Sequence, residues 1–86
     1  MNITIDLKKI YLEVSGETAK INDIEKYLTE ILKAAGEGND IILTGAAPIW
    51  MYLKIAHALH GKAKRLLYSA PGQDLKEFEI FNHNPH

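Results

Sequence analysis

Apolar and polar side chains alternate in the first part of the chain. In residues 3–5, and again in residues 10–14, apolar side chains occupy every second position. Because successive side chains of a strand point to opposite faces, this period predicts two short, half-buried strands. We expect the two strands to pair as a hairpin, and Ser15-Gly16-Glu17 then breaks the pattern.

After residue 20 the apolar spacing changes to three and four, which is typical of an amphipathic helix. Asn22 is the expected N-cap, with Glu25 three residues further on, and Gly36 stands where a left-handed C-terminal residue is favoured. The apolar positions of this helix are Ile21, Ile24, Tyr27, Leu28, Ile31, Leu32 and Ala35.

A short apolar run, Asp40–Thr44, predicts an interior strand that is covered on both faces. Gly45-Ala46-Ala47-Pro48 leads from it into a second helix over residues 49–59, which ends at Gly61. Proline suits the first helical turn because its missing N–H would be unpaired there. The apolar circumference of this helix is nearly complete, so we expect it to pack on more than one side, including against another subunit.

The remaining residues predict two more strands. Residues 64–69 are expected to form one strand, 70–73 its turn, and 77–81 a last strand with Phe78 and Ile80 on one face.

These elements follow in the order ββαβαββ, as one domain over residues 1–86. The central strand–helix–strand unit should be parallel, because such a crossover joins parallel strands. We therefore expect an α+β fold, a small mixed-sheet two-layer sandwich. The tail from Asn82 to His86 is expected to fray.

Chain length and composition narrow the class of protein. A chain of 86 residues buries only about 60–65% of the surface that its unfolded form exposes, so oligomerisation is expected. No apolar run approaches the roughly 18–20 residues that a membrane span needs, and the start lacks a signal-peptide pattern. Cysteine is absent, which excludes disulfides, thiolate metal sites and cysteine nucleophiles. We expect a cytoplasmic protein with no membrane partner.

Charge is distributed unevenly, although the net charge is only −1. Between residues 41 and 73 there are four basic side chains and no acidic one, whereas both flanking segments are acidic in sum. The net charge argues against a general nucleic-acid coat protein, and no DNA partner is expected. A segment without carboxylates is what an anionic ligand favours, although a chance cluster gives the same pattern.

The loop Thr44-Gly45-Ala46-Ala47-Pro48 is the most informative local feature. It leaves the carboxyl end of a predicted strand and enters a helix N-terminus. Unpaired N–H groups and the positive end of the helix dipole meet there, and small side chains let a phosphate approach the backbone. The alternative is that a tight strand-to-helix turn simply needs small residues, since the loop matches neither the Walker nor the dinucleotide pattern.

His57 and His60 lie three residues apart at the end of the second predicted helix. Their imidazoles therefore share a face and could bind a metal, contact a phosphate or transfer a proton. Alternatively, histidines near a helix C-terminus stabilise the helix dipole. No Asp or Glu accompanies them within the helix, so a third metal ligand has to come from elsewhere, with His83, His86 and Asp74 as candidates.

Three further residues are expected to lie close to the loop. Trp50 could stack on a nucleobase, although such aromatics more often belong to the core. Tyr68-Ser69 ends the next parallel strand, whose carboxyl end lies at the same edge of the sheet as the loop.

The chain resembles the small stand-alone ring nucleases that are associated with type III CRISPR systems. The resemblance rests on the string Thr44-Gly45-Ala46-Ala47-Pro48-Ile49-Trp50, on Ala56-His57-x-x-His60 and on Tyr68 at the end of a strand. Asn82-His83 is similar to the family's Ser-His near the end of its last strand. The similarity covers about residues 39 to 83, and the amino-terminal half agrees only in length and element order.

Members of that family degrade cyclic tetra-adenylate, the second messenger of type III systems, and so switch the antiviral response off. The resemblance implies a homodimer, two dimers that can sandwich one ring, a ligand-binding loop at Thr44–Pro48 and a catalytic role for His60. Cleavage would be an in-line attack by a ribose 2′-hydroxyl on the adjacent phosphodiester, with His60 transferring a proton or holding manganese. His57 and Ser69 are the other candidate catalytic residues, and Trp50 is a candidate ligand contact.

Two departures from the family pattern concern charge. The family's Asp-Pro-Arg after the strand tyrosine is Ser69-Ala70-Pro71 here, and Ala46 stands where the family's loop usually has an arginine. Asp74 or Arg65 would have to supply the missing groups from other positions. The expected function is binding and cleavage of cyclic tetra-adenylate or a similar short adenylate RNA. The alternatives are a non-catalytic binding module, a manganese-dependent RNA exonuclease and a purely structural oligomer.

Overall fold

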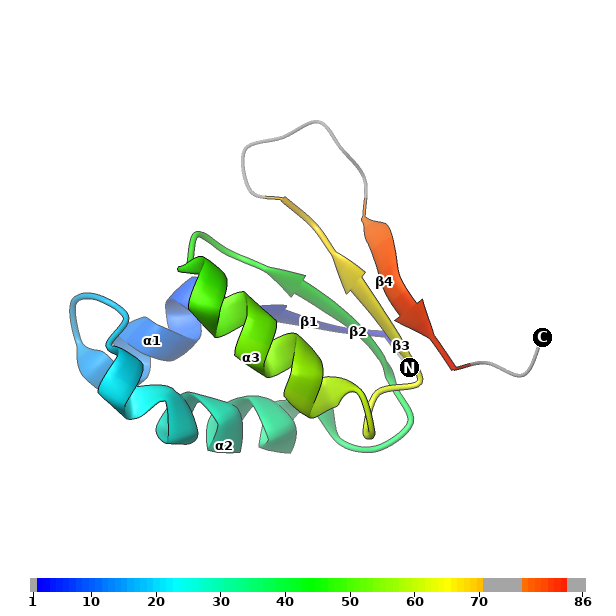
Figure 1. Cartoon of the computed structure of the whole chain (residues 1–86), viewed down its shortest axis with the longest axis horizontal. Helices are drawn as coiled ribbons and strands as arrows, with labels where there is room; N and C mark the ends of the chain where they lie inside the picture. Colours follow the sequence, from blue (N-terminus) through cyan, green and yellow to red (C-terminus); the bar gives the residue numbers. More distant parts are fainter. Residues whose placement is uncertain (1, 71–76, 84–86) are drawn as a thin grey trace.

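The computed structural model describes residues 2–70 and 77–83, which form one mixed sheet with helices packed on it (Figure 1). The elements are β1 (Asn2–Asp6), α1 (Leu7–Ser15), the 3₁₀ turn η1 (Ile21–Asp23), α2 (Ile24–Ala35), β2 (Asp40–Thr44), α3 (Ile49–Leu59), β3 (Arg65–Tyr68) and β4 (Phe78–Asn82). The predicted α+β class with a mixed sheet is confirmed. Within the described ranges, no helix has the length and apolar character needed to cross a membrane.

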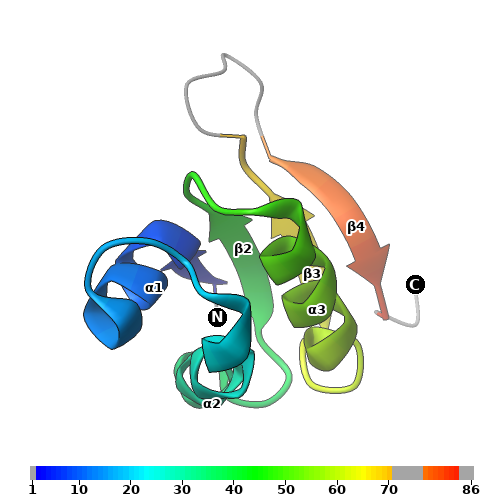
Figure 2. The same cartoon turned by 60° about the vertical axis from the view of Figure 1, so that its left-hand side comes forward.

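The sheet has the strand order β1-β2-β3-β4, in which the first three strands are parallel and β4 is antiparallel to β3. Ile41 of β2 lies opposite Leu66 of β3, so the predicted central parallel unit, β2–α3–β3, is confirmed. Because β1, β2 and β3 are parallel, their carboxyl ends lie at one edge of the sheet, where α1 and α3 begin (Figure 2).

The segment after β1 is a helix, so the predicted second strand over residues 10–14 is wrong. Asp6 caps this helix: its Oδ1 accepts hydrogen bonds from the backbone N–H groups of Lys8 at 2.9 Å and Lys9 at 3.4 Å. The same segment also has apolar residues at helical spacing, and these pack in or against the core, namely Leu7, Ile10, Tyr11 and Val14. β1 therefore pairs with β2 rather than with its neighbour in sequence, and the element order is βααβαββ.

The predicted helix after residue 20 is present, but it begins at Ile24 because Ile21–Asp23 form a 3₁₀ turn. Asp23, rather than the predicted Asn22, occupies the N-cap position. The predicted C-terminal glycine is confirmed: Gly36 has φ 66°, and its N–H donates to the Leu32 carbonyl at 3.2 Å. The buried face of α2 consists of Tyr27, Leu28, Ile31 and Ala35.

β4 pairs with β3 through a bulge. Phe81 lies opposite Leu66 and Phe78 opposite Tyr68, which leaves Ile80 as the extra residue. Because a bulge disturbs the alternation of side chains, Ile80 and Phe81 both lie on the helix side, where Ile80 lines a cavity with α3. The predicted turn at residues 70–73 lies outside the described residues except for Ala70, and so do positions 84–86 of the tail.

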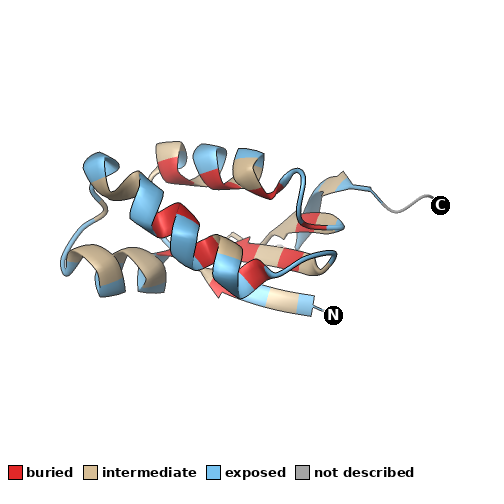
Figure 3. Cartoon of the chain, turned by 90° about the horizontal axis from the view of Figure 1, so that it is seen from below, coloured by how far each residue is buried: buried red, intermediate tan, exposed pale blue. Residues whose placement is uncertain are grey.

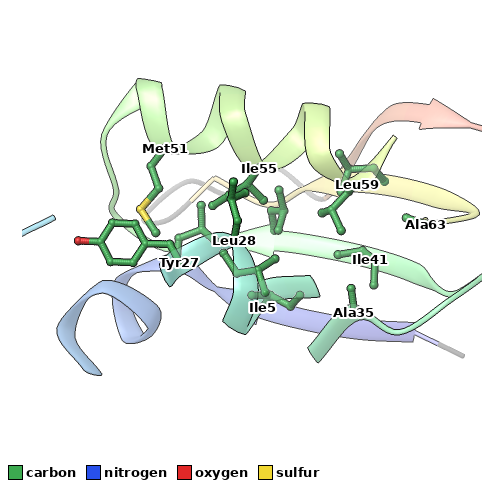
Figure 4. Packing of buried hydrophobic residues seen from close by; sticks show 13 residues of the cluster. Ile5, Tyr27, Leu28, Ala35, Ile41, Met51, Ile55, Leu59 and Ala63 are labelled. Carbon is green, nitrogen blue, oxygen red and sulfur yellow. The ribbon is translucent and has the colours of Figure 1, made fainter. Parts of the chain in front are cut away.

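The core lies between the helices and one face of the sheet. In Figure 4, Ile55 and Leu59 of α3 project toward the strands and Met51 toward Tyr27 of α2, and Figure 3 shows the buried positions gathered between the two layers. β2 is an interior strand, as predicted. However, its buried side chains Ile41 and Leu43 alternate with half-buried Ile42, so the helices cover only one of its two faces.

Candidate functional site

Gly45 turns the loop tightly against the junction of β1 and α1. Its φ is 104°, a conformation that side-chain-bearing residues rarely adopt. A Cβ at this position would overlap Asp6 Oδ1 and would stand 3.0 Å from the backbone nitrogens of both Leu7 and Lys8. The close approach of the loop to the start of α1 therefore requires a glycine here.

Two tyrosine hydroxyls hold the loop from the protein side. Tyr52 Oη donates to the Gly45 carbonyl at 2.6 Å, and Tyr11 Oη donates to the Ala46 carbonyl at 3.2 Å. In a trans peptide the N–H points away from the carbonyl, so the N–H groups of Ala46 and Ala47 point away from these tyrosines. Among the described residues, neither N–H finds an acceptor. The loop thus presents two free donors next to the first turn of α3, as the phosphate-binding interpretation requires.

The end of β3 lies beside the loop, as predicted. Thr44 Oγ1 donates to the Ser69 carbonyl at 2.7 Å, and the Ser69 N–H donates to the Leu43 carbonyl at 2.9 Å. Ser69 therefore belongs to the loop end of the molecule, together with Thr44.

Burial raises the pKa of the Tyr52 phenol to about 12, with smaller contributions from neighbouring Tyr68 and from Asp6. The ring of Tyr68 stands edge-on to Tyr52, with 5.2 Å between the centroids. Tyr52 consequently stays protonated at neutral pH and remains a hydrogen-bond donor to the loop.

α3 begins at Ile49. Pro48, which was predicted to lie in the first helical turn, occupies the N-cap position instead. The Pro48 carbonyl accepts hydrogen bonds from the N–H groups of Met51 at 3.1 Å and Tyr52 at 3.3 Å. Trp50 is half-buried and packs against the core, so its predicted contact with a nucleobase would use only the exposed part of the ring.

Because the segment after β1 is a helix and not a strand, it brings to the loop residues that were not predicted to lie there. Lys8 and Lys9 lie in the first turn of α1, where the Lys8 nitrogen approaches Gly45. Their side chains are exposed, and neither forms a salt bridge within the described residues. Asp6 is the carboxylate beside the loop, and it is engaged in capping α1. A shallow cleft of about 270 Å³ borders the loop and is lined by Tyr11, Thr18, Ala19, Ala46, Ala47 and Pro48.

Of the candidate companions of His57 and His60, the structure places His83 against His60. The His60 ring lies edge-on to His83, with 4.6 Å between the centroids, and 5.2 Å from the ring of Phe81. His83 is held at this position because its N–H donates to the Lys64 carbonyl at 2.8 Å. His57 is exposed on the last turn of α3 and makes no ring contact within the described residues.

The loop and the histidine pair lie at opposite ends of α3. The helix has 11 residues, which at the usual rise separates its ends by about 16 Å. The predicted catalytic residues are therefore not brought together: Ser69 lies with the loop, and His60 lies at the far end.

Manganese does not fit the described residues of a single chain. Residues 2–70 and 77–83 contain no cluster of three or more His, Asp or Glu side chains that could hold a metal ion. Manganese favours oxygen ligands together with imidazole, whereas His60 and His83 supply two imidazoles. Two of the candidate third ligands, Asp74 and His86, lie outside the described residues.

Comparison of this chain with protein-family models, with curated proteins and with solved structures finds no match.

Proposed function

We propose that this chain binds cyclic tetra-adenylate, or a similar short adenylate RNA, through the loop Thr44–Pro48, and cleaves it with the assistance of His60. The observation that carries the proposal is the orientation of the loop: tyrosines hold the carbonyls of Gly45 and Ala46, which leaves the N–H groups of Ala46 and Ala47 free. These donors precede the N-terminus of α3, a helix without any acidic side chain. Together they suit a phosphodiester.

The histidine pair supplies proton transfer in this proposal. One neutral imidazole of the His60–His83 pair takes the proton of a ribose 2′-hydroxyl, whose oxygen attacks the adjacent phosphorus. The P–O5′ bond breaks, and the protonated imidazole of the pair gives its proton to the departing oxygen. The products are a 2′,3′-cyclic phosphate and a 5′-hydroxyl. No step requires a metal, and manganese dependence remains a prediction.

Cleavage in this proposal requires two copies of the chain. Because α3 separates the loop from His60 by about 16 Å, a phosphodiester held at one loop meets His60 of a different copy. A homodimer, and a tetramer in which two dimers sandwich one ring, are therefore parts of the proposal. We also place the activity in the cytoplasm.

The experiment follows cyclic tetra-adenylate and its products by chromatography, with and without manganese. We expect the wild-type chain to open the ring, His60→Ala to lose at least about 100-fold in rate, and His57→Ala to retain most of it. An equal mixture of His60→Ala and the loop variant Ala46→Glu should regain activity that neither variant has alone. Equal rates for wild type and His60→Ala would contradict the catalytic assignment.

A non-catalytic binding module is the second candidate. It is favoured by the distance between His60 and the loop, and by Ser69 at the position where the family has an aspartate. A serine accepts hydrogen bonds but supplies no fixed negative charge. This candidate predicts that wild type and His60→Ala both retain the intact ring. Preferential trimming of linear RNA would instead identify an exonuclease.

A further inference from the structure

The outer side of α3 and the adjoining strand β4 expose apolar side chains. Ile49 and Leu53, one helical turn apart on α3, are 76% and 67% exposed, and Phe78 and Ile80 of β4 are 51% and 47% exposed. These four residues form what we call the α3–β4 face. In Figure 1, β4 lies beyond α3 at the edge of the sheet, and no described helix lies over it.

The bulge in β4 adds Phe81 to the helix side of the sheet beside this face. Phe78 and Ile80 lie on the same side by regular strand alternation, whereas without the bulge Phe81 would point to the opposite side of the sheet. Ile80 and Leu53 line the same apolar cavity of about 300 Å³ between α3 and the sheet, and Phe78 stands edge-on to Tyr68 with 5.4 Å between the ring centroids. The face therefore combines a protruding apolar ridge, Ile49 and Leu53, with an apolar groove beside it.

We infer that the α3–β4 face is the surface through which two copies of this chain associate around a twofold axis. A twofold interface uses the same patch on both copies, so the patch must be complementary to itself. A ridge beside a groove of the same apolar chemistry meets that requirement, because the ridge of each copy can enter the groove of the other.

The size of the α3–β4 face is compatible with a second copy of the chain as its partner. At the exposed fractions given above, the four side chains present roughly 500 Å² of apolar surface, more than half of the ~800 Å² that each partner buries in a standard interface. α3 carries no carboxylate, so docking against it does not bury an unpaired acidic group. A chain of 86 residues has a small core, and dimerisation adds the buried apolar area that it lacks.

Sedimentation velocity between about 5 and about 500 µM tests the inference without any nucleotide. We expect the wild-type chain to be a dimer, and Leu53→Glu and Ile80→Glu to weaken the dimer by at least about 100-fold while retaining the wild-type circular dichroism spectrum. Ile21→Glu is the matched control, because Ile21 is 62% exposed on η1, which contributes no residue to this face, and the variant should remain dimeric. A wild-type monomer at the highest concentration, or equal effects of Leu53→Glu and Ile21→Glu, would overturn the inference.

A second measurement does not depend on how the glutamate variants fold. The chain contains no cysteine, so Leu53→Cys and Ile21→Cys each introduce a unique thiol at an exposed site. A bismaleimide that spans about 10 Å should join two Leu53→Cys chains in high yield and Ile21→Cys chains only at the level of random collision. Equal yields for the two variants would contradict a twofold interface at this face.

Discussion

Gly45 is the residue on which the shape of the loop depends, because it combines a positive φ with contact against the start of α1. Gly16 is a matched control, since its φ of 94° is similar but an added Cβ would meet nothing within 4 Å. We expect Gly16→Ala to cost roughly 1–2 kcal/mol in the free energy of unfolding, the usual cost of a left-handed alanine. Gly45→Ala should cost at least about 3 kcal/mol because it adds steric overlap to that strain. Urea denaturation measures both, and equal losses would contradict the close approach.

Tyr52 is the second residue for which we predict a measurable effect, the raised pKa of its phenol. Its pKa is raised from 10.0 to about 12, so the folded chain holds this proton more tightly than the unfolded chain does. Its contribution to stability is therefore complete below pH 10 and is lost as the pH rises through 12. Ultraviolet titration should show a phenol ionising near pH 12 that is missing in Tyr52→Phe. If the Tyr52→Phe titration matches that of the wild type, the high pKa belongs to another group.

At the scale of elements, α1 depends on its cap. Asp6 accepts the first N–H groups of the helix, so Asp6→Ala should lower the free energy of unfolding by about 1 kcal/mol. Asp6→Asn keeps a capping oxygen but removes the charge, and it should restore most of that loss. Thermal or urea unfolding of the two variants separates capping from charge, and equal stabilities for Asp6→Ala and wild type would contradict the cap.

Helix α1 also shows where sequence patterns fail. Residues 10–14 satisfy a strand period, but Leu7, Ile10 and Tyr11 satisfy a helical one at the same time. Two features decide in favour of the helix. Asp6 caps it, and β1 pairs with β2, a strand that is distant in sequence. The long helix α2 was predictable because only a helical period fits it, and α3 because Pro48 and Gly61 bound a run of helix-compatible residues.

At the scale of the whole molecule, the candidate site was predictable only in part. The loop could be recognised because a strand, small residues and a helix follow one another directly in sequence. His83 could be named only as one of three candidate companions of the histidines, because its contact with His60 depends on the register of β4 and on its bulge. Neither the register nor the bulge has a local signal in the sequence, whereas the helical spacing of His57 and His60 does.

The arrangement of α3 gives the molecule two candidate functional ends. The free N–H groups of the loop lie at one end and the histidine pair at the other, while the α3–β4 face runs alongside between them. Association of copies is consequently part of both proposals, yet each can fail separately, because ligand retention is measured with a nucleotide and self-association without one.

The most direct test of the central claim is the equilibrium retention of cyclic tetra-adenylate by variants of the exposed loop residue Ala46. Ala46→Glu places a negative charge beside the free N–H groups and should weaken binding at least about 10-fold, whereas Ala46→Arg should strengthen it about 10-fold. Ala34→Glu and Ala34→Arg, at an exposed position of α2, should bind as the wild type does. Retention that is the same for all variants, or absent in the wild type, would contradict the account.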